Sequence, residues 1–227
     1  NNMKFDNIYI LVPVFNENKV IRNTLNELLK FFSNIIVVND GSTDNTIDKL
    51  DDLNIALLNH EINLGVGAAV QTGFDYVEKI HDSYAVITFD ADGQHSVEDA
   101  VSMAKEIQIC NEEIIFGSRF IKHQKNVPLV KRNVLKVIAF ITKIATGIDL
   151  TDAHNGLKAY KVSAIRKLKL QFSGYSYESE LITEVAKKNI SYKELSTNIK
   201  YTEYSIKKGQ KLTNGLLIIE DLLKLWR

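Results

Sequence analysis

The 227-residue sequence has little cysteine, proline or tryptophan: one, two and one residue, respectively. The single Cys110 excludes a disulfide framework or a cysteine metal cluster and fits a reducing compartment, so we expect a cytoplasmic protein. Uncharged apolar runs near the ~20 residues that a membrane span needs are also missing. The most apolar stretch, residues 137–142, is short and lies between Lys136 and Lys143. The start shows no signal-peptide pattern, and a membrane-crossing protein is not expected.

Charge is balanced overall but unevenly distributed. Residues 1–100 hold 6 Lys and Arg against 16 Asp and Glu, whereas residues 101–227 hold 22 against 12. An acidic half can hold a cation, and a basic half can meet an anion such as a phosphate or a membrane surface. A dipolar surface without function is the alternative. The apolar and charged fractions, 45% and 25%, are those of a globular protein and exclude disordered and fibrous classes.

Strand-like and helix-like segments alternate through the first half. Apolar, β-branched runs predict strands at residues 7–14, 35–38, 55–58, 84–89 and 113–116, with helices at 18–32, 43–53, 65–80 and 96–109. Ser96 is expected to cap the last of these helices, with Asp99 three residues on. This order predicts an α/β fold with a mostly parallel, Rossmann-like sheet flanked by helices. Ligands of such sheets bind beyond the carboxyl ends of the strands.

The regular alternation of strand-like and helix-like segments ends after Gly117. An apolar stripe predicts a long helix from about residue 130 to 145, followed by β-like runs at 157–160 and 190–195 with a helix at 177–188 between them. A strongly apolar helix is expected at 215–226; it could dock on a membrane surface or partner, or pack on this domain or on a second copy in a homodimer. We predict one domain, 1–227, whose halves 1–117 and 118–227 bind the two substrates.

The first, second and fourth predicted strands each end in polar residues, which should converge at one edge of the sheet. The strongest of these ends is Asp90-Ala91-Asp92-Gly93-Gln94. Two neighbouring carboxylates repel each other when desolvated, unless a cation or hydrogen-bond donors offset them. Oxygen ligands suit Mg²⁺ or Mn²⁺, which keep positions open for diphosphate oxygens. A solvated acidic turn is the alternative, and Asp44 is more simply a helix cap.

The segment Asn63-Leu64-Gly65-Val66-Gly67 is a poor match to a dinucleotide-binding fingerprint, because it follows the third strand and lacks the third glycine. Close approach of a helix backbone to a ligand or to the sheet is the better interpretation. The first strand ends in PVFNEN, without glycine. That excludes the glycine-rich phosphate loop expected of a nucleotidyltransferase.

Six motifs occur in a characteristic order: PVFNEN, VVNDGSTD, NLGVGAAVQTGF, FDADGQH, GSRF and DAHNGLKAY. This set resembles the family 2 glycosyltransferases, which have the GT-A fold, from Tyr9 to about Gln210. Within that family the chain is most similar to the dolichyl-phosphate mannose synthase-like enzymes, which load sugars onto polyprenyl phosphates.

The resemblance implies an inverting, metal-dependent transfer from a UDP- or GDP-linked sugar to a polyprenyl phosphate, at the inner face of the membrane and without nucleic acid. The alternative acceptor is a sugar hydroxyl in polysaccharide, lipopolysaccharide or glycoprotein synthesis. A distant alternative is a non-catalytic module that binds sugar nucleotides.

Site residues follow from the same resemblance. On the donor side it implies base and ribose contacts, diphosphate contacts and three metal-side ligands, Asp90, Asp92 and Gln94. The donor-binding residues are expected to be Pro13, Phe15, Glu17, Asp40, Asn63, Gly65, Asp90 and Asp92.

On the acceptor side, Arg119 is expected near the phosphates and Arg132 at the acceptor phosphate, in a cleft bordered by residues 117–132 and 200–212. Asp152 is expected close to the transferred sugar. Lys207 and Lys208 are either acceptor contacts or an ordinary solvated surface. If the acceptor is a hydroxyl, a carboxylate must take its proton. Residues 174–180 lack the acidic pair that serves as general base in many members of the family, so the motif does not assign this base. Asp152 is the first candidate and Glu180 the second.

Overall fold

A seven-stranded sheet forms the centre of the computed structural model, which describes residues 5–121, 129–171 and 177–199. The strand order is β3-β2-β1-β4-β6-β5-β7. The strands are β1 (Ile8–Val14), β2 (Asn34–Asp40), β3 (Ala56–His60), β4 (Ala85–Thr88), β5 (Ile114–Ser118), β6 (Lys158–Lys161) and β7 (Tyr192–Ser196). Central strands are buried on both faces, which is why they read as continuous apolar runs.

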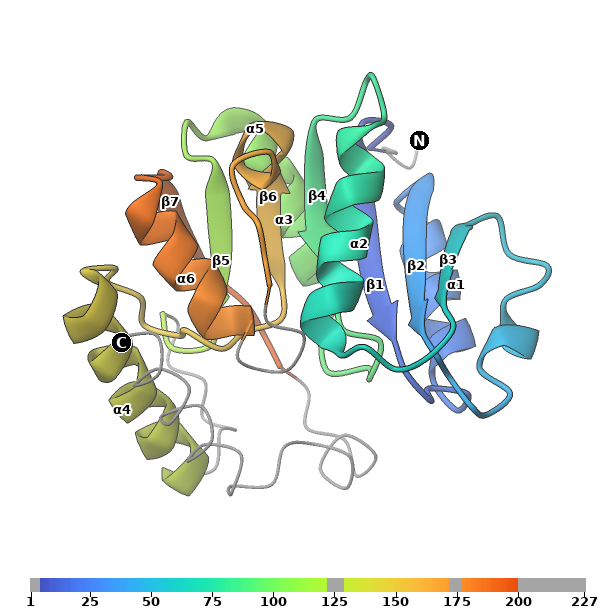
Figure 1. Ribbon diagram of the computed structural model, residues 1–227, viewed down its shortest axis with the longest axis horizontal. Coiled ribbons are helices and arrows are strands. Elements are labelled where there is room, and N and C mark those ends of the chain that lie inside the picture. The colour runs from blue at the N-terminus through green and yellow to red at the C-terminus, as the bar shows by residue number, and fades with distance from the viewer. Residues whose placement is uncertain (1–4, 122–128, 172–176, 200–227) are drawn as a thin grey trace.

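Helices cover both faces of the sheet (Figure 1). One face packs against α2 (Val66–Glu78), α5 (Val162–Ile165) and α6 (Tyr177–Lys187), with the long helix α4 (Leu129–Thr146) outside α6. The other face packs against α1 (Ile21–Leu29) and α3 (Val97–Ile109). The result is the three-layer α/β/α arrangement expected from the sequence. None of the helices in the described ranges is long and apolar enough to cross a membrane.

One strand runs against the others. β6 is antiparallel to both of its neighbours, β4 and β5, while all other pairs are parallel. Because β6 is reversed, its beginning lies at the edge where the parallel strands end, with Lys158 opposite Thr88. The segment 152–156 before β6 is thereby placed beside the end of β4.

The helix predicted at residues 43–53 is wrong. This segment forms turns around one 3₁₀ turn, η1 (Ile47–Lys49). The Asp44 carboxylate accepts hydrogen bonds from the backbone N–H and the hydroxyl of Thr46. Such local side-chain bonds compete with the helical backbone pattern in a stretch rich in Asp and Asn.

The remaining predicted elements within the described ranges are confirmed to within a few residues, and the short helix α5 was not predicted. The helix expected at 215–226 lies outside the described residues. Ser96 is confirmed as the cap of α3, since its hydroxyl accepts from the backbone N–H of Asp99 at 3.1 Å. The Asp99 carboxylate does not complete a capping box; it accepts from the backbone N–H of Asn198 at 2.7 Å.

Candidate active site

The loops after β1 and β2 are joined by polar contacts. Asn16 has a positive φ of 55°, a conformation that Asn tolerates better than most residues. Its backbone N–H donates to the Ser42 hydroxyl at 3.0 Å, and its side-chain oxygen accepts from the Thr43 N–H at 2.8 Å. The next N–H, of Glu17, donates to the Thr46 hydroxyl at 2.9 Å. The motifs PVFNEN and VVNDGSTD therefore build one structural unit.

Asp40, at the end of β2, is buried and holds the start of α2. Its two oxygens accept from the backbone N–H groups of Leu64 and Gly65 at 2.8 and 2.7 Å, and Nδ1 of His60 lies 2.8 Å away. Close approach also shapes this region, because a Cβ on Gly41 would lie 2.4 Å from the Ile62 carbonyl carbon. A carboxylate has about four acceptor sites, so direct contact between Asp40 and a nucleotide base stays a prediction.

A cleft of about 230 Å³ opens where β1, β2 and β4 end. Its size is below the roughly 300–1,000 Å³ of a typical ligand pocket, so it would hold one part of a larger ligand. Five of the predicted donor residues share it with Asp90. The lining residues are Pro13, Val14, Phe15, Glu17, Asp40, Val66, Ala69, Asp90, Ala91 and Asp92.

The two carboxylates of the DXD sequence have different surroundings. Nε2 of the buried His95 lies 3.1 Å from Asp90. Burial opposes ionisation of Asp90, but His95, Lys158 and Arg119 together hold its pKa below the ordinary value. Burial, and then the negative charge of Asp90, raise the pKa of Asp92 instead.

These residues fit a divalent cation. The pKa of Asp92 is raised although Gln94 donates to it from both its backbone N–H and its side-chain amide. A cation would favour the ionised carboxylate and so oppose both burial and the charge of Asp90, which raise this pKa. Within the described ranges no three His, Cys, Asp and Glu side chains gather into a complete metal site. Mg²⁺ is commonly bound through one or two carboxylates together with substrate phosphates.

Gly156 leaves the space that Asp90 occupies. A Cβ at this position would lie 2.0 Å from Oδ2 of Asp90. Behind it, the buried ammonium of Lys158 binds the Glu178 carboxylate and donates to the Asn155 carbonyl at 2.5 Å. The start of β6 thus supplies both room and positive charge to Asp90.

Arg119 directly follows β5, and Asp152 begins the segment 152–156. The two side chains form a buried ion pair. Nε and a terminal nitrogen of Arg119 donate to the two Asp152 oxygens at 2.5 and 2.6 Å, and the Arg119 backbone N–H adds a third contact at 3.1 Å. Burial opposes ionisation of Asp152, but the charge and hydrogen bonds of Arg119 hold its pKa below the ordinary value. A low-pKa carboxylate bound on both oxygens is a poor general base. Arg119 is 4% exposed, and its orientation towards the expected acceptor cleft stays a prediction.

The other expected residues are spread around this edge. Glu180 is buried on α6 and accepts from the Gln171 backbone N–H at 2.8 Å. Asn63 is exposed and the Gly65 N–H is used by Asp40. Arg132 is half-buried on α4. The expected cleft border includes residues 122–128 and 200–212, which lie outside the described residues, as do Lys207 and Lys208.

Several site-building residues were not predicted. His95, Lys158 and Glu178 stand in segments singled out from the sequence, but no role was assigned to them. Lys158 carried a usable signal, since a lysine inside an apolar strand must find a buried partner. Glu194 on β7 carried no such signal in the sequence. In the structure its carboxylate accepts from the backbone N–H and hydroxyl of Thr151, both at 2.9 Å.

The model of the family "Glycosyl transferase family 2" matches residues 9–169. The chain belongs to glycosyl transferase family 2. The family accounts for the strand-end motifs in their observed order, and the resemblance stated from the sequence is confirmed.

Among its relatives is a UDP-N-acetylglucosamine–dolichyl-phosphate N-acetylglucosaminyltransferase of Methanococcus voltae, 34% identical, which aligns over 96% of this chain and 95% of its own length. An undecaprenyl-phosphate mannosyltransferase of Micrococcus luteus is 25% identical, over 79% and 78% of the two chains. The crystal structure of glucosyl-3-phosphoglycerate synthase from Mycobacterium tuberculosis with Mn²⁺, UDP and phosphoglyceric acid is 13% identical, with a TM-score of 0.71 over 97% and 78% of the chains. This likeness confirms the GT-A fold.

Proposed function

We propose that this chain transfers a sugar from a UDP-linked donor to a polyprenyl phosphate, with Mg²⁺ or Mn²⁺ bound at Asp92 and Asp90. The observation that carries the proposal is the Asp92 carboxylate, whose pKa is raised by burial and by Asp90, and which lines the same cleft as Phe15 and Glu17. The dolichyl-phosphate transferase of M. voltae, related along almost the whole chain, supports the donor and the lipid acceptor.

Different residues of the cleft are proposed to contact different parts of the donor. Phe15, 39% exposed, offers a ring on which a base can stack, and Glu17 offers a carboxylate to the ribose hydroxyls. His95 and Gly156 fix Asp90, and Gln94 orients Asp92. A divalent cation held by Asp92 and Asp90 would supply positive charge against the departing diphosphate.

In the reaction, a phosphate oxygen of the acceptor forms a bond to C1 of the sugar, and the bond from C1 to the diphosphate oxygen breaks. The nucleoside diphosphate leaves with the bonding electrons, and attack from the opposite face inverts C1. An acceptor phosphate is already anionic and needs no general base. Both carboxylates predicted as bases for a hydroxyl acceptor, Asp152 and Glu180, are bound to other groups, which favours the phosphate.

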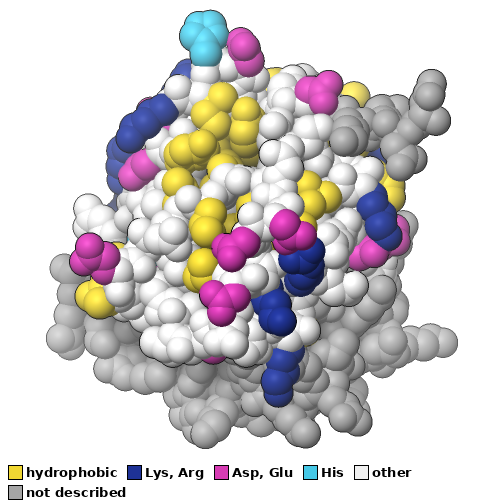
Figure 2. Space-filling model, turned by 90° about the vertical axis from the view of Figure 1, so that its right-hand side faces the viewer, with side chains coloured by type: hydrophobic (Ala, Val, Ile, Leu, Met, Phe, Trp, Pro, Cys, Tyr) yellow, Lys and Arg dark blue, Asp and Glu magenta, His cyan; other side chains and the backbone are white. Residues whose placement is uncertain are grey.

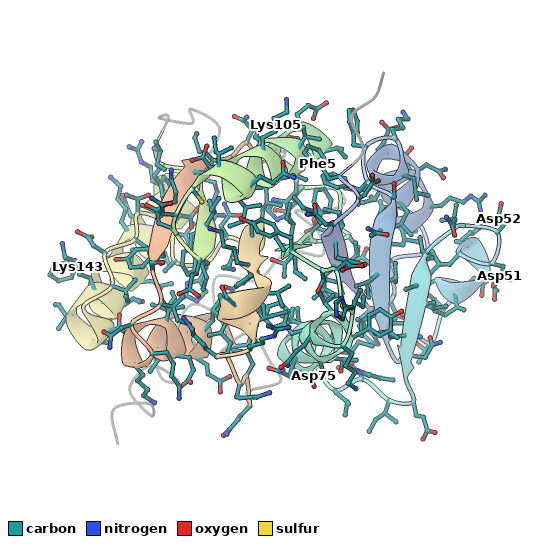
Figure 3. All side chains as sticks on the ribbon, turned by 90° about the horizontal axis from the view of Figure 1, so that it is seen from above. Phe5, Asp51, Asp52, Asp75, Lys105 and Lys143 are labelled. Atoms are coloured by element: carbon teal, nitrogen blue, oxygen red, sulfur yellow. The ribbon has the colours of Figure 1, made fainter. Side chains whose placement is uncertain are left out.

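The experiment compares Asp92→Asn with Asp51→Asn, an exposed carboxylate at the far β3 edge (Figure 3). Calorimetric titration with UDP and Mn²⁺ should show binding to the wild type and the control but at least tenfold weaker binding to Asp92→Asn, because the cation loses a charged ligand. Unchanged titration of Asp92→Asn would refute the metal assignment.

The acceptor is tested separately, with labelled UDP-sugars offered to a polyprenyl phosphate or to a free sugar hydroxyl. We expect label on the lipid, and Arg132→Ala should reduce this transfer while hydrolysis of the donor continues. Label on the hydroxyl acceptor alone would replace the lipid phosphate with the alternative acceptor class.

A further inference from the structure

His60 connects the end of β3 to the end of β2 and to α2. It is the last residue of β3 and lies opposite Asp40 in the parallel register of the two strands. Nδ1 of His60 lies 2.8 Å from Oδ1 of Asp40, and Nε2 lies 2.9 Å from the hydroxyl of Thr72 on α2. β3 is the edge strand on the side that Figure 2 shows, where acidic and basic side chains lie next to each other. His60 does not belong to this charged surface, because its side chain is only 10% exposed.

The two partners of His60 determine which ring nitrogen carries the hydrogen. An ionised carboxylate only accepts hydrogen bonds, so Nδ1 carries the hydrogen and donates it to Asp40. In the neutral imidazole Nε2 is then an acceptor, and the Thr72 hydroxyl donates to it. Thr72 therefore holds the ring with its N–H turned toward Asp40, which lines the cleft proposed for the donor.

The hydrogen bond from His60 limits how much of the Asp40 carboxylate is left for a ligand. Oδ1 accepts from His60 and from the backbone N–H of Leu64, and Oδ2 accepts from the backbone N–H of Gly65. A carboxylate has about four acceptor sites, which are shared between its two oxygens. Among the residues that the structure describes, the donors to Oδ1 therefore fill this oxygen, and Oδ2 keeps one site. Asp40 can accept one further donor, but not two donors side by side.

We propose that His60 is a positioning residue that makes Asp40 selective for uracil over guanine. Uracil presents a single N–H between two carbonyl oxygens. Guanine presents an N–H and an amino group side by side, and such paired donors suit both oxygens of one carboxylate. With Oδ1 occupied by His60, guanine would leave one of these donors unpaired, which costs binding energy. This assignment rests on the proposed function, which places the base in the cleft that Asp40 lines, and it adds a residue that selects the nucleotide.

The experiment is calorimetric titration of the full-length protein with UDP and with GDP, each with Mn²⁺ and without an acceptor. We expect the wild type to bind UDP about tenfold more tightly than GDP. In His60→Gln the side-chain amide takes the position of Nε2, so the contact with Thr72 is kept and the donor to Asp40 is lost. This variant should bind the two nucleotides roughly equally, because Oδ1 of Asp40 regains an acceptor site.

The matched control is His60→Asn, whose amide nitrogen takes the position of Nδ1. It keeps the donor to Asp40 and loses the contact with Thr72, so it should keep the wild-type preference for UDP. Each variant loses one hydrogen bond of the same ring, and similar urea midpoints are expected for both.

Three outcomes overturn the role of His60 alone: a wild type that binds GDP as tightly as UDP, a wild-type preference in His60→Gln, or an equal loss of preference in both variants. The last outcome would show a merely structural residue. A wild type that binds neither nucleotide would refute the proposed function and the role of His60 together.

Discussion

Replacing Asp152 with Asn should destabilise the fold strongly, although the side chain barely changes in size. The Arg119 and Asp152 side chains are 5% and 0% exposed, and three N–H groups of Arg119 donate to the carboxylate. Asparagine removes the negative charge that the buried guanidinium binds and turns an amide N–H₂ toward its donors. Removing one partner of a buried ion pair costs about 3–5 kcal/mol. We expect that loss in the free energy of unfolding, measured by equilibrium urea denaturation.

The control is the same substitution in an exposed pair of similar geometry. Arg22 donates to both oxygens of Asp52 at 2.5 and 2.6 Å, but these side chains are 41% and 67% exposed, at the far edge of the molecule from Lys143 (Figure 3). Water screens such a pair, so Asp52→Asn should leave the urea midpoint unchanged. Equal effects of the two substitutions, or a wild-type midpoint for Asp152→Asn, would refute the burial argument.

The stability that the Arg119–Asp152 pair contributes should also depend on pH. Its arginine holds the folded-state pKa of Asp152 below the unfolded value, which is about 3.9 for a free Asp. The stability that the pair adds is therefore complete above that value and is lost as pH falls through the lower, folded-state pKa. Unfolding free energies measured from pH 6 downward should fall more steeply below about pH 4 for the wild type than for Asp152→Asn.

Three glycines give further predictions. Gly156→Ala places a methyl group 2.0 Å from the Asp90 carboxylate; Asp90 must move, and UDP should bind at least tenfold more weakly with Mn²⁺ by calorimetry. Gly147→Ala, where a Cβ meets nothing within 4 Å but φ is 76°, should lower stability through backbone strain and leave UDP binding unchanged. Gly73→Ala brings a Cβ to 2.2 Å from a buried leucine of β1, and this overpacking should cost about 1–3 kcal/mol of unfolding free energy in urea while UDP binding stays as in the wild type. Wild-type stability of this variant would show that the core accommodates the methyl group.

The succession of strands along the first half of the chain could be predicted because each buried strand is a continuous apolar run that ends in polar residues. That pattern placed Phe15, Asp40 and Asp92 at one edge, and the structure brings them to one cleft. The reversed β6 could not be predicted: the run Leu157–Tyr160 is equally apolar in either direction, so it does not reveal whether it runs with β4 or against it.

The pairing of side chains around β6 could not be predicted either, because it depends on the direction of this strand. Arg119 and Asp152 are 33 positions apart, and they meet because β5 ends where the segment before the reversed β6 begins. Both residues were placed near the site from the sequence, but as separate groups facing a ligand. Their pairing changes the chemistry, since each neutralises the other and neither is open as an acid or base.

The balance of charge at the end of β4 connects the fold to the proposed function. The groups that hold the pKa of Asp90 low are His95, Lys158 and Arg119. Lys158 is fixed on β6 and Arg119 by its pairing with Asp152. Together they stabilise the ionised form of Asp90. Asp92, two residues further along, receives hydrogen bonds from Gln94 but remains with a raised pKa. The fold thus compensates the charge of one carboxylate of the pair and leaves the other for a ligand, which suits the cation proposed above.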